Sequence, residues 1–188
     1  MSNEYRDLER DKIEEEKQIV EKYPFLRMRA ECNCSYKDTK FPMMDLEIPD
    51  GWFRLFFMMC DDIKEVLEKE GILDAFYFMQ VKEKFNQLVC YCDTSVKEIE
   101  EILNKYNMMA YYVCTKCGKP AAYETQGYFA SYCEDCLNGL TRHGKVERIE
   151  FEPEFTIKTW TKEGSYEKTI SFEDEWNRYV KENGYDKL

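Results

Sequence analysis

The sequence predicts an α+β fold in which antiparallel β-hairpins pack with amphipathic helices and carry a four-cysteine zinc ribbon. Three observations support this class. Some segments repeat apolar residues at three- and four-residue steps, the period of an amphipathic helix, whereas others are short, extended and rich in aromatic residues. The two kinds of segment follow each other in a mixed order, which favours α+β over a doubly wound sheet. Two Cys-x-x-Cys pairs also have the spacing of a zinc ribbon.

The N-terminal segment 2–22 is rich in charged residues and stops at Tyr23 and Pro24. Proline cannot continue the hydrogen-bond ladder of a helix, so we expect a charged surface helix that ends at this point. The following stretch, 25–48, shows no regular period, and we expect a loop region with strand fragments.

A strong helix is predicted after Pro49, Asp50 and Gly51, and it should end at Gly71, because glycine readily adopts the left-handed conformation that closes many helices. Its apolar residues recur on one face, which we expect to lie in the core: Trp52, Phe56, Met59, Ile63, Val66 and Leu67.

Residues 75–92 predict a β-hairpin that turns at residues 85–87. Alternation would place Phe76, Phe78 and Gln80 on one face of its first strand and Tyr77, Met79 and Val81 on the other. Since both faces carry apolar residues, we expect this strand to be central in its sheet. The next segment begins with Ser95 and Glu98 at the spacing of a capping box, which predicts a helix.

The C-terminal part predicts a second hairpin over 154–170, with its turn at Glu163, Gly164 and Ser165. A helix should follow, capped by Ser171 with Asp174 and closed at Asn183 and Gly184. Its apolar face is expected to be buried and consists of Phe172, Trp176, Tyr179 and Val180.

The most specific motif is the set Cys114, Cys117, Cys133 and Cys136, two pairs separated by fifteen residues. This spacing offers four thiolates to one tetrahedral Zn²⁺ ion. Such a site leaves no open position for water or substrate, so we expect it to hold the fold together rather than to catalyse a reaction.

The chain contains nine cysteines, an odd number that argues against a full disulfide framework. One alternative is a second four-thiolate metal site, formed by Cys32, Cys34, Cys90 and Cys92. The other alternative is that Cys90 and Cys92 are small core residues and that the other two lie in a reduced loop. Cys60 faces inward on its predicted helix and is expected to be a packing residue.

No repeat and no Gly-, Ser- or Pro-rich linker divides the chain, so the boundaries come from the motif positions. We predict an α+β core with an N-terminal helix over 1–112 and a zinc ribbon over 113–144. Residues 145–188 are expected to form a hairpin and a helix that pack on the core.

The charge argues for a protein partner. The chain has 38 acidic and 27 basic residues and a net charge of -11, which disfavours direct binding to nucleic acid. The ribbon, 113–145, is the least acidic part, with four Lys and Arg residues against three Asp and Glu residues. We expect the acidic surface to meet a basic, nucleic-acid-handling protein. A homodimer that forms through the aromatic-rich surface stays an alternative.

No membrane partner is expected, because no apolar run is long enough to span a bilayer and the N-terminus lacks an apolar signal region. The abundance of cysteines without a disulfide framework favours a reducing compartment, and we expect the protein in the cytoplasm.

No catalytic residue and no organic cofactor site is predicted. His143 is the single histidine and follows Thr141 and Arg142 in a polar turn without a nucleophile motif. Phosphate loops, dinucleotide fingerprints and the common hydrolase motifs do not occur in the sequence. We therefore expect a protein that is not an enzyme.

One resemblance adds context. Segments 49–52, 60–63, 80–85 and 114–121 resemble a family of small uncharacterised proteins of phages, prophages and gut Firmicutes. The likeness runs from about Tyr23 to Cys136. Relatives usually carry glycines where this chain has Asn86 and Gln87, and they generally lack the Cys90 and Cys92 pair.

The resemblance implies a phage-borne context rather than an activity. Together with the acidic charge and the lack of a predicted active site, it leads to the hypothesis of a counter-defence protein, similar in character to anti-CRISPR inhibitors that occupy positively charged surfaces of a Cas nuclease. A small acidic chain without a predicted active site suits this function. Two rival classes stay open: a zinc-ribbon regulator that binds nucleic acid through Lys116 and Lys119, and a structural or assembly accessory of the phage.

Overall fold

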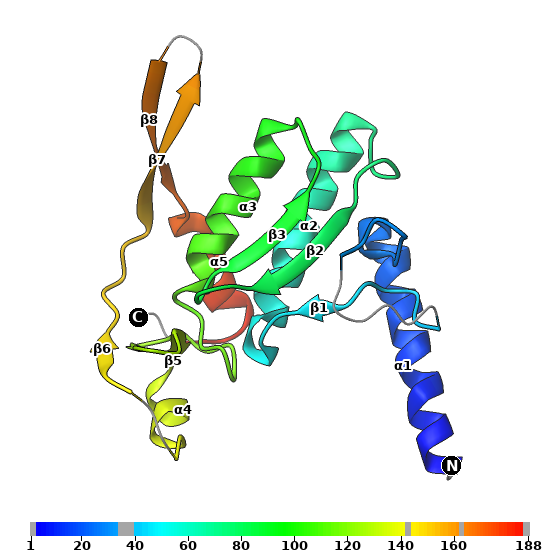
Figure 1. Cartoon of the computed structure of the whole chain (residues 1–188), viewed down its shortest axis with the longest axis horizontal. Helices are drawn as coiled ribbons and strands as arrows, with labels where there is room; N and C mark the ends of the chain where they lie inside the picture. The colour runs from blue at the N-terminus through cyan, green and yellow to red at the C-terminus, as the bar shows by residue number, and fades with distance from the viewer. Residues whose placement is uncertain (1–2, 34–39, 142–143, 162–163, 186–188) are drawn as a thin grey trace.

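The structure, a computed structural model, describes residues 3–33, 40–141, 144–161 and 164–185. Within these ranges the α+β prediction is confirmed (Figure 1). The α-helices are α1 (Asn3–Lys22), α2 (Phe53–Glu70), α3 (Lys97–Ala110), α4 (Glu134–Asn138) and α5 (Glu173–Glu182). The strands are β1 (Leu46–Glu47), β2 (Phe78–Glu83), β3 (Leu88–Cys92), β4 (Tyr123–Thr125), β5 (Ala130–Tyr132), β6 (Val146–Arg148), β7 (Glu154–Thr161) and β8 (Gly164–Ser171). Two 3₁₀ turns, η1 (Pro24–Leu26) and η2 (Asp50–Trp52), precede the first sheet strand and α2.

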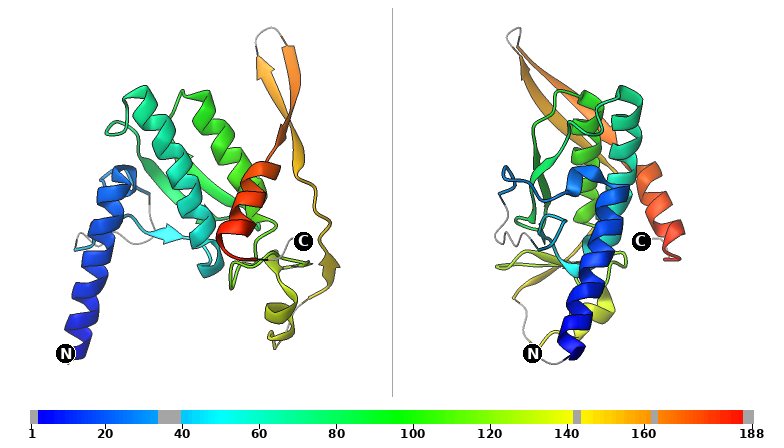
Figure 2. Two further views of the ribbon diagram at one scale, coloured as in Figure 1. Left: turned by 180° about the vertical axis from the view of Figure 1, so that it is seen from behind. Right: turned by 90° about the vertical axis from the view of Figure 1, so that its right-hand side faces the viewer.

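The body of the protein is a three-stranded sheet in the order β1-β2-β3. Strand β1 is parallel to β2, and β2 is antiparallel to β3, so the predicted hairpin and its central first strand are both confirmed. Helices α2 and α3 lie side by side over one face of this sheet (Figures 1 and 2). Phe78 of β2 packs against Phe56 of α2 and against Phe25 of η1, and all three rings are fully buried, where large rings supply much of the hydrophobic stabilisation.

The predicted alternation of side chains between the two faces of β2 is wrong after Phe78, because the strand contains a bulge of one residue. The pairing shifts between Phe78 and Gln80, which leaves Met79 as an extra residue opposite β3. A bulge reverses the sense of the alternation beyond it. Phe78 and Val81 are therefore both buried, although strict alternation would send them to opposite faces.

The helix positions are confirmed, but the predicted caps are not. Helix α2 ends at Gly71, whose φ of 70° is left-handed as expected. Helix α3 begins one residue later than the predicted capping box requires, because its first carbonyl acceptor is that of Val96. The hydroxyl of Thr94, not that of Ser95, accepts the Val96 amide at 3.1 Å.

Helix α5 likewise starts after Phe172 rather than after Ser171, so the predicted pair with Asp174 does not form a capping box. Ser171 still contributes: its hydroxyl accepts the Glu173 amide at 3.3 Å. The buried face of this helix is the predicted one.

Strands β7 and β8 form the predicted second hairpin, which extends away from the body as an arm (Figures 1 and 2). Of its predicted turn residues, Glu163 lies outside the described residues, whereas Gly164 and Ser165 belong to β8 and pair with β7, so the predicted turn is placed too late in the chain. Lys168 on the arm bonds to Glu101 on α3 at 2.6 Å, and Phe155 at its base packs on Phe172. The arm is thus anchored at its base.

A single hydrophobic cluster joins the three predicted parts of the chain. Trp176 and Tyr179 on α5 belong to it, as does Trp52 at the start of α2. Strand β6 lies beyond the predicted ribbon boundary yet pairs with β4 inside the ribbon, in the order β5-β4-β6. The domain division stays a prediction. None of the helices in the described part of the chain is long and apolar enough to cross a membrane.

Candidate metal centre

The four predicted cysteines come together at one point of the fold. The Sγ atoms of Cys114, Cys117, Cys133 and Cys136 all lie within 4.8 Å of one another, and those of Cys117 and Cys133 are 3.6 Å apart. A tetrahedral ion with metal–sulfur bonds of about 2.3 Å would place its ligands about 3.8 Å from each other. The four cysteines are therefore positioned to bind a metal ion.

The first pair lies on a tight turn before β4. The Gly118 amide donates to the Cys114 carbonyl at 3.0 Å, and the Cys114 amide donates to the Lys119 carbonyl at 2.8 Å. Gly118 has a φ of 80°, which residues with a side chain rarely adopt. Glycine at this position allows the chain to turn back and bring both sulfurs to the same side.

The second pair lies at the start of α4. Cys133 is the residue before the helix, and its carbonyl accepts the Leu137 amide at 3.0 Å. Cys136, in the first turn, then points to the same side as Cys133. Lys119 of the first turn reaches Asp135 of this helix at 3.2 Å and links the two halves across the surface.

The electrostatics of the centre favour a bound cation. Burial raises the pKa of both Cys133 and Cys136 above the ordinary range of a thiol. Burial also acts to raise the pKa of Cys117, but the Lys119 amide and the neighbouring thiols outweigh it and leave that pKa below its ordinary value. Four thiolates so close together repel one another, and a divalent cation would remove this repulsion.

The ribbon is attached to the body through its first turn. The Gly51 amide donates to the Thr115 carbonyl at 2.9 Å, and the Trp52 indole donates to the Val113 carbonyl at 3.1 Å. A Cβ atom added to Gly51 would lie 2.1 Å from the Cys114 carbonyl oxygen. Only glycine lets the two backbones approach this closely.

Two further contacts hold the ribbon from other sides. The hydroxyl of Tyr179, on α5, donates to the Gly118 carbonyl at 2.6 Å. The side-chain amide of Asn86, at the tip of the β2–β3 hairpin, donates to the buried hydroxyl of Ser131 at 2.7 Å. Metal binding should therefore stabilise the helical core together with the ribbon, because these contacts cross between them.

The remaining cysteines do not extend this centre. Within the described residues, the four-cysteine cluster is the only group of three or more potential metal ligands. Cys60 is fully buried, as predicted, and the thiol of Cys32 contacts the Phe78 carbonyl at 3.5 Å. Cys34 and His143 lie outside the described residues, so the second site that would need Cys34 stays untested.

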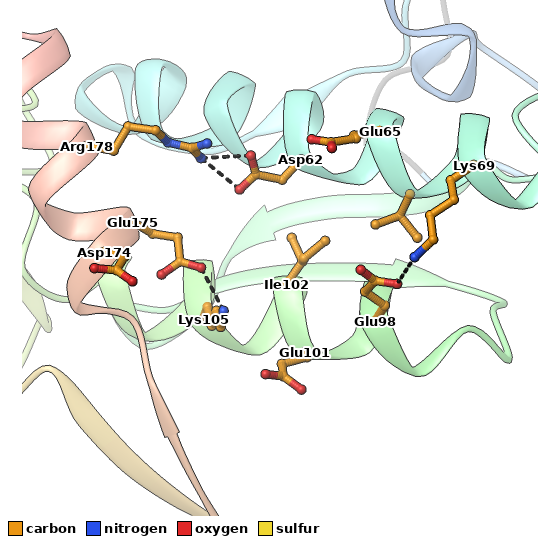
Figure 3. A pocket seen from close by; sticks show the side chains of 11 residues that line it. Asp62, Glu65, Lys69, Glu98, Glu101, Ile102, Lys105, Asp174, Glu175 and Arg178 are labelled. Atoms are coloured by element: carbon orange, nitrogen blue, oxygen red, sulfur yellow. Dashed lines mark hydrogen bonds and ion pairs between the residues drawn. The ribbon is translucent and has the colours of Figure 1, made fainter.

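A separate cleft of about 670 Å³ lies between α2, α3 and α5 (Figure 3). Carboxylates outnumber basic groups on its walls. The lining residues are Asp62, Glu65, Val66, Lys69, Glu98, Glu101, Ile102, Lys105, Asp174, Glu175 and Arg178. Arg178 contacts both oxygens of Asp62 at 2.8 Å and the hydroxyl of Tyr106 at 2.6 Å, which ties α2, α3 and α5 together.

Ion pairs neutralise part of this cleft. Lys105 bonds to Glu175 at 2.7 Å and Lys69 bonds to Glu98 at 3.3 Å. Within the described part of the chain, Glu65 and Asp174 have no ion-pair partner. Burial, together with the Asp62 carboxylate, raises the pKa of Tyr106, so this hydroxyl stays protonated and donates to Asp62 at 2.6 Å. The cleft keeps a negative charge at its open side.

A comparison of the chain with protein-family models, with curated proteins and with solved structures finds no match.

The sequence indicated the four sulfur ligands, but it did not indicate the residues that hold the ribbon in place. In the sequence, Gly51 belongs to a predicted helix start, Asn86 to a predicted turn and Tyr179 to a predicted apolar helix face. The sequence contains one signal for the close approach between Gly51 and the cysteine turn: Gly51 is a residue without a side chain next to Trp52 at a predicted helix start.

Proposed function

We propose that this protein is a non-enzymatic inhibitor, held in shape by Zn²⁺, that a phage or another mobile element uses in the host cytoplasm. Its target would be the basic nucleic-acid groove of a host defence nuclease, such as a Cas nuclease. Zinc is the proposed ion because four thiolates in a closed tetrahedral set suit it best.

The observation that carries this proposal is the charge of the helical face. Helices α2, α3 and α5 together carry twelve Asp and Glu residues against seven Lys and Arg residues, and the acidic cleft lies between them. Such a surface attracts a groove that is lined with Lys and Arg and repels nucleic acid. The resemblance to phage and prophage proteins also supports an inhibitor of host defence.

The first experiment is phage plaquing on hosts that each carry one defined CRISPR–Cas system, with and without this protein. We expect plaquing to recover on at least one host. The purified nuclease from that host should then lose target cleavage when this protein is added. Recovery on none of the hosts, together with no binding to any of the purified nucleases, would reject the proposal.

A charge-reversal variant locates the interaction. Changing Glu65→Lys and Asp174→Lys reverses the two cleft carboxylates that have no ion-pair partner within the described residues, and inhibition should fall by about tenfold or more. The control, Glu150→Lys with Glu154→Lys, makes the same change in net charge on exposed positions between β6 and the start of β7. Equal inhibition by the two double variants would exclude the helical face as the contact surface.

A second candidate, a nucleic-acid-binding regulator, is favoured by one observation. The exposed large apolar side chains of the described residues lie on two neighbouring hairpins, and they are Phe85, Tyr91, Tyr128 and Phe129. Lys82 lies over Tyr91, and Lys84 lies over Phe85. Exposed rings beside lysines are typical of proteins that stack single-stranded bases.

This candidate depends on salt, on the lysines beside the exposed rings and on Lys116 of the ribbon; Lys119 is left unchanged because it pairs with Asp135 at the metal centre. Mobility shifts of a single-stranded oligonucleotide at low and high salt, with Lys82→Glu, Lys84→Glu and Lys116→Glu, separate the two functions. A salt-sensitive shift that these substitutions abolish would favour the regulator. The absence of a shift at low salt would favour the inhibitor.

A further inference from the structure

A second, smaller cleft lies between α1, the segment that leads into β1 and the first residue of α2. Its volume is about 310 Å³, which is at the lower end of the range of small-ligand sites. The lining is mostly apolar and includes three methionines: Lys12, Glu15, Glu16, Ile19, Met28, Phe41, Met43, Met44, Asp45, Leu46 and Phe53. The walls are thus flexible thioethers and rings around a few charged groups.

Glu16 is the unusual member of this lining. It is only 7% exposed, which is rare for a glutamate, and one of its oxygens accepts the Met43 amide at 3.3 Å. Among the described residues, the other oxygen has only Lys12, at 3.9 Å. A carboxylate offers about four acceptor positions, so most of the capacity of Glu16 for hydrogen bonds is unused.

Burial is the main reason why the pKa of Glu16 lies above its ordinary value, and the Met43 amide and Lys12 offset this only in part. A buried carboxylate with so few donors gains stability from a cation that brings hydrogen bonds with it. The neighbours Glu15 and Asp45 add to the negative field at the cleft.

The ring of Phe41 already binds a cation within the protein. The ammonium of Lys12 lies 4.4 Å from the centre of that ring, while its side chain is 62% exposed. A cation over an aromatic face is attracted by the electron density of the ring. Because the Lys12 side chain is largely exposed to solvent, a cationic group of a partner protein can displace its ammonium from the Phe41 ring or bind beside it.

We propose that this cleft binds the side chain of an arginine from the basic partner protein. The guanidinium would pair with the Glu16 carboxylate and lie on the Phe41 ring, and its aliphatic stem would contact Met28, Met43 and Met44. Arginine suits the site better than lysine, because its planar fork bonds to a carboxylate through two parallel hydrogen bonds and stacks on rings. This inference rests on the proposed function, from which it takes the basic partner.

The test uses the full chain with its methionine methyl groups labelled with ¹³C, observed by NMR. The probe is the peptide acetyl-Gly-Arg-Gly-amide, and its citrulline counterpart serves as a neutral control of the same shape. We expect the methyl signals of Met28, Met43 and Met44 to shift in a saturable way with the arginine peptide only. No shift at millimolar arginine peptide, or equal shifts with citrulline, would overturn the proposal.

Two variants sharpen the result. Glu16→Gln keeps the size of the side chain and an acceptor for the Met43 amide, and it should weaken arginine binding by about tenfold or more. Glu14→Gln removes the same charge from an exposed position of the same helix and should leave binding unchanged. Equal binding by the Glu16 variant would refute the role of the buried carboxylate.

A third measurement separates this inference from the proposed function. If Glu16→Gln inhibits the nuclease as well as the wild type does, while the Glu65 and Asp174 double variant fails, the cleft is not a contact site and the proposed function stands. If the wild type itself binds none of the nucleases yet binds the arginine peptide, the cleft stands and the proposed function fails.

Discussion

The substitution Gly51→Ala tests how firmly the metal centre is joined to the core. The added Cβ atom would lie 2.1 Å from the Cys114 carbonyl oxygen and 2.8 Å from the Gly118 nitrogen, and both are backbone atoms that cannot rotate away. The two turns must therefore separate by about 1.5 Å to reach ordinary van der Waals contact. That movement breaks the 2.9 Å hydrogen bond from the Gly51 amide to the Thr115 carbonyl.

The magnitude follows from two contributions. Overpacking costs about 1–3 kcal/mol, and leaving buried backbone groups without a partner costs a similar amount. We expect a loss of about 3–5 kcal/mol in the free energy of unfolding, or a decrease in Tm of about 6–20 °C for a chain of this length.

The assay combines guanidinium unfolding, monitored by the fluorescence of the buried tryptophans, with a colorimetric measurement of bound zinc. Gly139→Ala is the control, because its φ is -79° and the nearest atom to its added Cβ is at an ordinary distance of 3.5 Å. This control should stay within about 0.5 kcal/mol of the wild type. A Gly51 variant with wild-type stability and full zinc content would refute the close approach between η2 and the first turn.

Three further outcomes are expected. Removing the proposed Zn²⁺ with a chelator should release about one ion per chain and lower the Tm of the whole protein, so circular dichroism and tryptophan fluorescence should report a single transition; separate transitions would show an independent ribbon. Tyr179→Phe removes the 2.6 Å hydrogen bond to the Gly118 carbonyl and should cost about 1–3 kcal/mol in urea unfolding, whereas no loss would mean that this carbonyl finds another donor. Because the pKa of Glu16 is raised in the folded protein, its charge destabilises the fold at neutral pH and this penalty disappears as the carboxyl is protonated. Glu16→Gln should therefore raise the Tm at pH 7 by more than at pH 5, and a pH-independent difference would contradict the raised pKa.

Local sequence patterns predicted helices and strands correctly where the pattern lies within one continuous segment. The apolar period of α2 and the glycine at its end lie within consecutive residues, so both could be predicted. The cap predictions failed because Val96 and Phe172, rather than the serines, precede the two helices. Both are poor N-cap residues that pack in or against the hydrophobic core, so packing rather than side-chain capping decides where these helices begin. The bulge at Met79 could not be predicted either, since the register of a strand depends on its partner.

The four cysteines that meet at the metal centre could be predicted, because the spacing within each Cys-x-x-Cys pair is a property of one short turn. What surrounds them depends on how the whole chain packs. Asn86 meets Ser131 across 45 positions of the chain, and Tyr179 meets Gly118 across 61, so no local pattern could indicate these contacts. The same holds for the cleft at Glu16, whose walls come from α1, the segment before β1 and α2. Sequence spacing specifies a ligand set, whereas folding alone brings distant segments to the same place.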